Sequence, residues 1–254
     1  MTIMKRKEII ELLHRIEERE EIEILYACEA GSRALGFAND DSNHDIRFIY
    51  KKPNVKDYLS LEEPSDMIEC VGDDLDFIGW DIRKALMLHY KSDSTLRECF
   101  ISSLVYIDKG IESIFSGLGG FDIDVLKNDY ASIAHNRWKM YCTLEFGKEK
   151  SKKYLYVVRS ILCWMLLNRD IYPPIDILEL VNHDFINLDD GVRQAINDLI
   201  DFHQNNGDLS ERTVFILNSF ILDSLSMMKN TKTKSHKQLE DYDERFRELL
   251  LVCR

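Results

Sequence analysis

The sequence lacks the cysteine spacing of a zinc site or a disulfide framework. Its six cysteines are scattered along the chain, no two form a CxxC pair, and most lie inside apolar segments. Zinc sites and small disulfide-linked folds need cysteines at short, regular intervals, so neither is expected. We therefore predict reduced, buried thiols and a cytoplasmic protein.

Long apolar runs and an excess of positive charge are also missing. No segment approaches the roughly 18 uncharged apolar residues of a membrane span, and residues 1–21 carry charges where a signal peptide would be apolar. The chain has 33 Lys and Arg against 45 Asp and Glu, a net charge of -12. We expect no membrane association and no general coating of nucleic acid, because binding many phosphates needs clustered cations.

A polyanion could still bind at a local patch of positive charge. Two groups of lysines offer such a patch, although solvated helix ends or loops are the simpler interpretation of each. They are Lys148, Lys150, Lys152 and Lys153, and then Lys229, Lys232, Lys234 and Lys237.

The hydrophobic pattern predicts two different halves. A charged, amphipathic segment at residues 5–20 is typical of a helix, and alternating apolar residues then predict strands. The expected strands are 22–28, 45–50, 67–71, 75–78 and 104–107. After a glycine-rich break the period is helical, with helices expected at 124–147, 151–168, 174–182, 189–204, 209–228 and 238–252. The predicted fold class is α+β: a small mixed-sheet domain at residues 1–118 followed by an all-helical domain at 119–254.

Two helix starts in the second half carry recognisable signals. Pro173 and Pro174 suit the entry to the helix at 174–182, since proline is tolerated in a first turn. Asp208 and Glu211 have the spacing of a capping box for the helix at 209–228.

The most informative stretch lies between the first two predicted strands. Gly31 and Ser32 follow a strand, where a glycine without a Cβ lets backbone N–H groups and a hydroxyl approach a phosphate. Asn43 and Asp45 are two residues apart at the next strand, so both side chains are expected to face the same side. Oxygen ligands beside a triphosphate bind Mg²⁺. Glu29 is expected to brace this loop as a buried acceptor of backbone hydrogen bonds.

These residues resemble a known family. GSRALGF at 31–37 and DSNHDIRFIY at 41–50 are similar to the polymerase beta-type nucleotidyltransferases, whose hallmark is Gly-Ser, about ten residues, and then Asp-x-Asp. Within that superfamily they resemble the RNA-ligase-associated predicted nucleotidyltransferases. LDFIGWDIRKAL at 75–86 and KKYLYVVR at 152–159 continue the resemblance in the expected order.

The resemblance implies a reaction and a set of ligands. The implied reaction transfers an NMP group, AMP by default, from an NTP to an RNA end or a protein hydroxyl, with two Mg²⁺ ions, or one, as cofactor. The implied metal-binding and catalytic positions are Asn43, Asp45 and Asp76, with Asp74 as the rival of Asp76. The predicted nucleotide-binding residues are Gly31, Ser32, Arg33 and Arg47, together with Lys153, Tyr156 and Arg159 on one helix. An ordinary solvated helix end is the alternative for the last three.

Asn43 departs from the family pattern. It offers a neutral carbonyl where a metal-binding carboxylate is expected, which removes one negative charge from a site for two dications. Three interpretations stay open: a degenerate nucleotide binder, an enzyme with one tightly held metal, or a chain altered to disable catalysis. The alternative functions are a catalytically weak nucleotide-binding regulatory module and an antitoxin-like or phage-encoded modifier.

Overall fold

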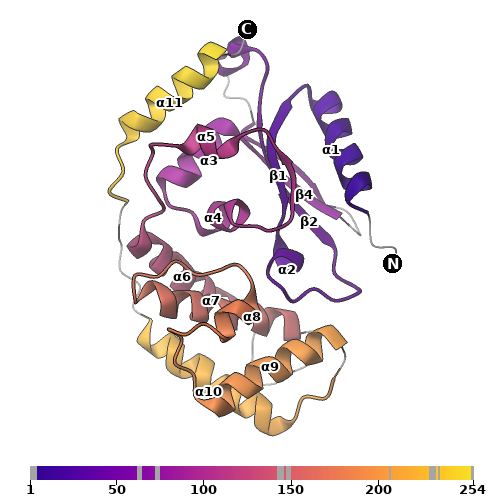
Figure 1. Cartoon of the computed structure of the whole chain (residues 1–254), viewed down its shortest axis with the longest axis vertical. Helices are drawn as coiled ribbons and strands as arrows, with labels where there is room; N and C mark the ends of the chain where they lie inside the picture. Colours follow the sequence, from indigo (N-terminus) through magenta and orange to yellow (C-terminus); the bar gives the residue numbers. More distant parts are fainter. Residues whose placement is uncertain are drawn as a thin grey trace. The chain divides into compact units, whose positions relative to one another are not determined.

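The structure is a computed structural model that describes residues 5–61, 65–71, 75–141, 146, 150–205, 207–228, 233 and 235–252. The chain forms two compact units (Figure 1). The first unit comprises residues 1–34, 41–121 and 235–254, and the second comprises 35–40 and 122–234. The main passage from one unit to the other follows Phe121. Two segments depart from the expected division, because 35–40 joins the helical unit and 235–254 joins the sheet unit.

The first unit is built on a five-stranded mixed sheet with strand order β3-β4-β2-β1-β5. β2 and β4 are parallel, and the other neighbouring pairs are antiparallel. The strands are β1 (Glu23–Glu29), β2 (His44–Lys51), β3 (Met67–Val71), β4 (Leu75–Asp81) and β5 (Val105–Asp108). Each predicted strand is present, and the predicted α+β class is confirmed.

Helices cover both faces of this sheet. On one face Ile46, Phe48 and Phe77 pack against α1 (Arg6–Glu20). On the opposite face Tyr26 and Trp80 belong to a second core with further helices, which Figure 1 shows on the side away from α1. These helices are α3 (Ile82–Tyr90), α4 (Ser94–Phe100) and α5 (Ile111–Phe115), and a 3-10 turn, η1 (Val55–Tyr58), lies nearby in the chain. Burying both apolar faces contributes about 25 cal/mol per Å².

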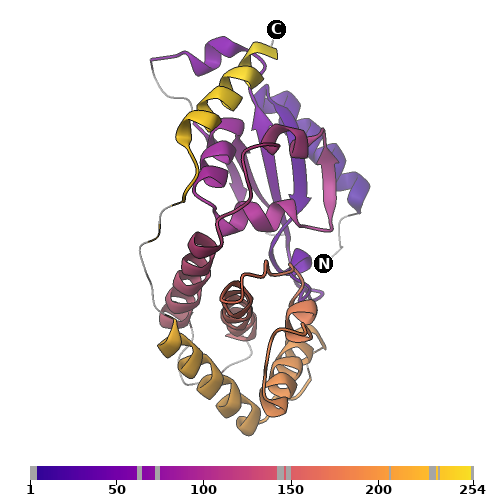
Figure 2. The ribbon, with the colours of Figure 1, turned by 60° about the vertical axis from the view of Figure 1, so that its left-hand side comes forward.

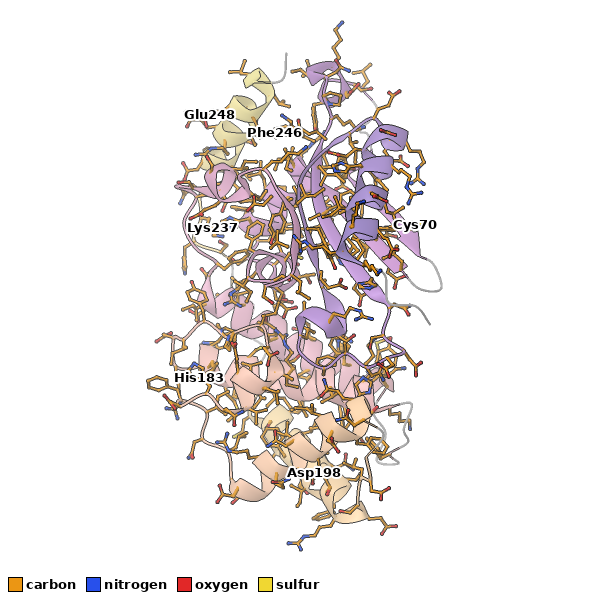
Figure 3. The ribbon with its side chains drawn as sticks, turned by 45° about the vertical axis from the view of Figure 1, so that its right-hand side comes forward. Cys70, His183, Asp198, Lys237, Phe246 and Glu248 are labelled. Carbon is orange, nitrogen blue, oxygen red and sulfur yellow. The ribbon has the colours of Figure 1, made fainter. Side chains whose placement is uncertain are left out.

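The last helix, α11 (Leu239–Val252), packs on the first unit. The Tyr242 side chain is buried, and its hydroxyl lies 2.6 Å from Nδ1 of His89. The Phe246 ring contacts the ring of Tyr58 edge-on at 5.4 Å. In Figure 3 Phe246 lies on the side of α11 nearer the sheet unit and Glu248 on the outer side. This apolar inner face explains why the helix joins the sheet unit and not the helical unit expected from its place in the sequence.

The second unit is entirely helical in the part of the chain that the structure describes, and α7 is its most buried element (Figure 2). Its helices are α6 (Ile123–Tyr141), α7 (Ser151–Leu167), α8 (Ile177–Val181), α9 (Asp190–Asn205) and α10 (Glu211–Met227). None of the described helices of the chain is long and apolar enough to cross a membrane.

Two predicted helix starts in this unit are wrong. α8 begins after Asp176, whose Oδ1 accepts hydrogen bonds from the N–H groups of Leu178 and Glu179, so the prolines precede the helix and do not open it. α10 is capped by Ser210 and not by a box starting at Asp208. In both cases a nearer side chain satisfies the first N–H groups of the helix.

Candidate active site

The turn after β1 brings its backbone against a carboxylate of β2. Gly31 begins the short helical turn α2 (Gly31–Ala34) with φ at +55°. A Cβ at this position would lie 1.8 Å from Oδ2 of Asp45, so only glycine leaves room for the carboxylate. The N–H of Ala30 donates to the Asp45 carbonyl at 2.7 Å and fixes the turn to the strand.

Two carboxylates lie side by side on this sheet. Asp45 of β2 is the register partner of Asp76 on the parallel strand β4. Residues in register on neighbouring strands project from the same face, so both carboxylates emerge from one face at the start of their strands. Two aspartates so placed repel each other unless a cation lies between them.

Two buried oxygen atoms of this site have no hydrogen-bond partner among the described residues. They are Oδ1 of Asp76 and Oγ of Ser32, whose side chain is completely buried. A buried polar atom without a partner is costly in a folded protein and points to a ligand or ion that would complete it. Carboxylate, hydroxyl and amide oxygens are the ligands that Mg²⁺ prefers, so the residues fit that ion.

Glu29 organises this region from the opposite face of the sheet. Its buried carboxylate accepts a hydrogen bond from the N–H of Asp45 at 2.9 Å and lies 2.8 Å from Nδ1 of His44. The hydroxyl of Tyr106 donates to the same carboxylate, and burial together with Glu29 raises the pKa of Tyr106. The predicted bracing role of Glu29 is confirmed. This network fixes the start of β2, and with it the position of Asp45.

Arg33 and Asn43 lie in the loop that precedes β2. The Arg33 guanidinium donates to the carbonyls of Ser42 at 2.6 Å and Asn43 at 3.3 Å, so it holds this loop in place. Asn43 is half-buried and lies one residue before β2, which begins at His44. The alternation of side chains along β2 therefore does not place the side chain of Asn43 on the face of Asp45. This differs from the expectation that both residues belong to one strand.

Arg47 shares the Asp45 face by strand alternation. Its Nη1 donates to the carbonyl of Ile46 at 3.2 Å. The hydrogen bond with Cys28 and burial raise the pKa of Cys99, and the charge of Arg47 opposes this shift. Asp74, the rival of Asp76, lies outside the described residues. Within the described part of the chain, no three carboxylate, imidazole or thiol side chains converge to hold a metal ion.

The three predicted nucleotide-binding residues of α7 do not share one exposed face. Arg159 is buried, and its Nε donates to the carbonyl of Ile175 at 3.1 Å. Lys153 and Tyr156 are half-buried and contact aromatic rings of the helical unit. Arg159 therefore contacts the backbone of its own unit, and its role in nucleotide binding stays a prediction.

The second half of the GSRALGF motif has a role that the sequence did not indicate. Residues 35–40 are held by the helical unit, where the N–H of Ile177 donates to the carbonyl of Leu35 at 3.0 Å. Nε2 of Gln204 donates to the carbonyls of Gly36 at 3.2 Å and Ala38 at 3.3 Å. The signal that could have indicated this is a second glycine in the motif, since Gly36 has φ at +83°.

Comparison with known proteins identifies the family of this chain. The sequence matches the RNA repair pathway DNA polymerase beta family, RlaP, over residues 5–251. It is 37% identical over 184 residues to the uncharacterized protein YcgL of Bacillus subtilis (strain 168), which covers 70% of this chain and 69% of that protein. A crystal structure of a nucleotidyltransferase-like protein from Exiguobacterium sibiricum 255-15 aligns over 96% of this chain and 87% of that one, with 8% sequence identity and a TM-score of 0.36. The resemblance inferred from the motifs is confirmed: the chain belongs to the RNA repair pathway DNA polymerase beta family, a polymerase beta-like nucleotidyltransferase family.

Proposed function

We propose that this protein is a Mg²⁺-dependent nucleotidyltransferase that moves an NMP group, AMP first among the candidates, from an NTP to a hydroxyl of an RNA end or a protein. One observation carries the proposal: Asp45 and Asp76 are in register beside the Gly31–Ser32 turn. Their proximity is unfavourable without a cation, and a fold that keeps them together is typical of a functional site.

The residues of the turn and the strands have separate tasks in this proposal. Gly31 lets a phosphate approach the backbone, and the Ser32 hydroxyl, which has no partner among the described residues, donates to a phosphate oxygen. Asp45 and Asp76 hold the metal, and Asn43 adds a neutral oxygen if its loop turns toward them. Mg²⁺ would supply neutralisation of the triphosphate charge and of the charge that develops on the pyrophosphate leaving group. Arg47 adds a positive charge on the same face.

Binding and transfer test the proposal in two steps. Isothermal titration measures ATP binding with and without Mg²⁺, and ATP labelled at the α-phosphate then measures transfer to RNA with a free 3′ hydroxyl or to protein. We expect Asp45→Asn and Asp76→Asn each to lower transfer by at least 100-fold, an effect of about 3 kcal/mol or more. Asp66→Asn is the matched control, because Asp66 pairs with Lys84 at 2.9 Å and is half-exposed. No binding of any NTP at millimolar concentration would refute the proposal.

Asn43 favours a second candidate, a nucleotide-binding regulatory module with weak catalysis. A site with one carboxylate fewer binds a second dication less tightly. If this candidate is correct, Asn43→Asp gains transfer activity while the affinity for NTP stays within about twofold. Equal transfer by the wild type and Asn43→Asp would exclude the regulatory module.

A further inference from the structure

The positive charge of this acidic protein is concentrated on one pair of helices. Between residues 130 and 168 there are seven Lys or Arg residues and two Glu, in a chain whose net charge is -12. Both glutamates, Glu145 and Glu149, lie in the connection between the helices. The stretch of α6 from Tyr130 and all of α7 contain no acidic residue. Such segregation creates a local positive potential on an otherwise negative molecule.

Four residues of these helices form two stacked contacts, here named the α6–α7 ladder. The Arg137 guanidinium of α6 lies 4.2 Å from the ring centroid of Tyr156 on α7. The Lys153 ammonium of α7 lies 4.1 Å from the ring centroid of Tyr141 on α6. Each helix thus contributes one cation and one aromatic ring, and each cation lies over the ring of the other helix. Cation–π contacts of this kind hold rings and charges in fixed positions.

The ladder is partly exposed, and its lysine has no carboxylate partner in the part of the chain that the structure describes. Tyr141 has 38% of its surface exposed and the adjacent Met140 66%. Among the described residues, neither Lys152 nor Lys153 pairs with a carboxylate. Burial and the charge of Lys152 both lower the pKa of His203. The lysines therefore offer positive charge to an external anion.

We propose that the α6–α7 ladder binds a single strand of nucleic acid. Single strands are bound without strong sequence preference where cations follow the backbone and aromatic rings stack on the bases. Here Lys152 and Lys153 contact phosphates, and a base stacks on Tyr141. Because this rests on the proposed function, the bound strand is the acceptor of the NMP group, which selects an RNA end over a protein hydroxyl.

The ladder also contacts the GSRALGF motif. The Tyr156 ring packs edge-on against Phe37 at 5.2 Å, and Phe37 follows the end of α2 by three residues. Both rings lie in the helical unit. Binding at the ladder thus takes place next to the segment that continues directly from the Gly31–Ser32 turn.

Fluorescence anisotropy of a labelled, unstructured RNA of about 12 nucleotides tests the proposal. This length is within the site sizes of single-strand binders. A DNA of the same sequence is the second probe. The full chain is titrated into each probe between about 50 and 200 mM KCl. We expect Lys153→Ala to reduce the slope of log affinity against log salt by about 0.7, the value for one lost phosphate contact on a single strand. Tyr141→Ala should weaken binding about tenfold with the slope unchanged, and Tyr141→Phe should restore it.

Matched variants separate the ladder from general surface effects. Lys127→Ala removes a lysine of α6 that pairs with Asp124 at 2.6 Å, and Phe215→Ala removes an exposed ring of α10, so both should bind as the wild type does. Asp45→Asn should also bind the RNA normally, because Asp45 is not part of the ladder. The proposal is overturned if the wild type binds neither probe at low salt, or if the Lys153 and Tyr141 variants match the wild type. Loss of ATP binding by Lys153→Ala with RNA binding intact would also overturn it and assign the lysine to the nucleotide.

Discussion

The carboxylate of Asp176 lies against the α-carbon of Gly36. Oδ1 of Asp176 caps α8 by accepting from the N–H of Leu178 at 2.7 Å, and a Cβ on Gly36 would lie 2.0 Å from Oδ2. One side chain therefore closes a helix and holds the segment that continues from the Gly31–Ser32 turn. The contact works only with a residue that has no side chain and tolerates a positive φ.

Gly36→Ala should destabilise the protein by about 3 kcal/mol, because it combines left-handed backbone strain with a displaced helix cap. Chemical denaturation measures the loss. Gly117→Ala is the matched control, since Gly117 has φ at +81° and open space where a Cβ would lie; strain alone should cost about 1 to 2 kcal/mol. Equal losses for the two variants would show that the contact with Asp176 is unimportant.

Asp76→Asn should stabilise the fold while abolishing transfer. The substitution removes one of two adjacent like charges and keeps the size of the side chain. Relief of this repulsion is expected to raise the free energy of unfolding by about 0.2 to 1 kcal/mol. Thermal melts without Mg²⁺ check it, alongside the transfer assay. A lower melting temperature would indicate that Asp76 is a structural residue, and the site would lose one of its two carboxylates.

The stability of the sheet unit should fall in acid because of His89. Burial, and then the charge of Lys237, lower the pKa of His89 to about 3, so the folded protein keeps this imidazole neutral. In the unfolded chain its pKa returns to about 6.5, and unfolding takes up a proton between those values. The contribution of His89 to the free energy of unfolding is complete above about pH 6.5, and it declines as the pH falls toward 3. Urea denaturation at pH 7 and pH 4.5 measures it.

His89→Gln is the variant for that experiment, and the readout is the slope of stability against pH. His14→Gln serves as the control, since His14 is an exposed residue of α1 that lies 2.8 Å from Glu17. We expect a shallower slope for His89→Gln alone. A slope unchanged from the wild type would contradict the assignment to His89.

Ser210→Ala should shorten or weaken α10. The Ser210 hydroxyl accepts from the N–H of Thr213 at 3.1 Å, and loss of such a cap costs about 1 kcal/mol. Asp208→Ala is predicted to be neutral, because Asp208 lies before the cap. Denaturation of both variants distinguishes the two positions, and a larger effect for Asp208 would restore the capping box expected from the sequence.

Local patterns were sufficient for the strands and for half of the site. Alternation predicted β1, β2, β3 and β4, and the spacing within the motif brought Asp45 beside the Gly31–Ser32 turn. The period of two also placed Asp76 on a strand, but its partnership with Asp45 depends on the parallel pairing of β2 with β4. That pairing is a long-range property that no window of sequence contains.

Other features could not be predicted because they depend on tertiary contacts. The short helices α4 and α5 lack enough turns for a clear period, although Asp93 caps α4 by accepting from the N–H of Leu96 at 2.9 Å. The amphipathic pattern of α11 gives its apolar face but not the core that this face joins. The spacing of Lys153, Tyr156 and Arg159 predicted one shared face, and only the packing of α7 shows that Arg159 is buried.

The return of α11 to the sheet unit has a consequence for synthesis on the ribosome. Tyr242 belongs to the same buried cluster as Tyr26, so the hydrophobic core of the first unit needs residues of β1 and of α11, which lie on either side of the helical unit in the sequence. Residues 122–234, the bulk of the helical unit, emerge before α11 does. The nascent sheet unit therefore exposes an apolar surface throughout translation of the helices, a state in which chaperones bind and aggregation begins. The native core of the sheet unit forms only after α11 has left the ribosome.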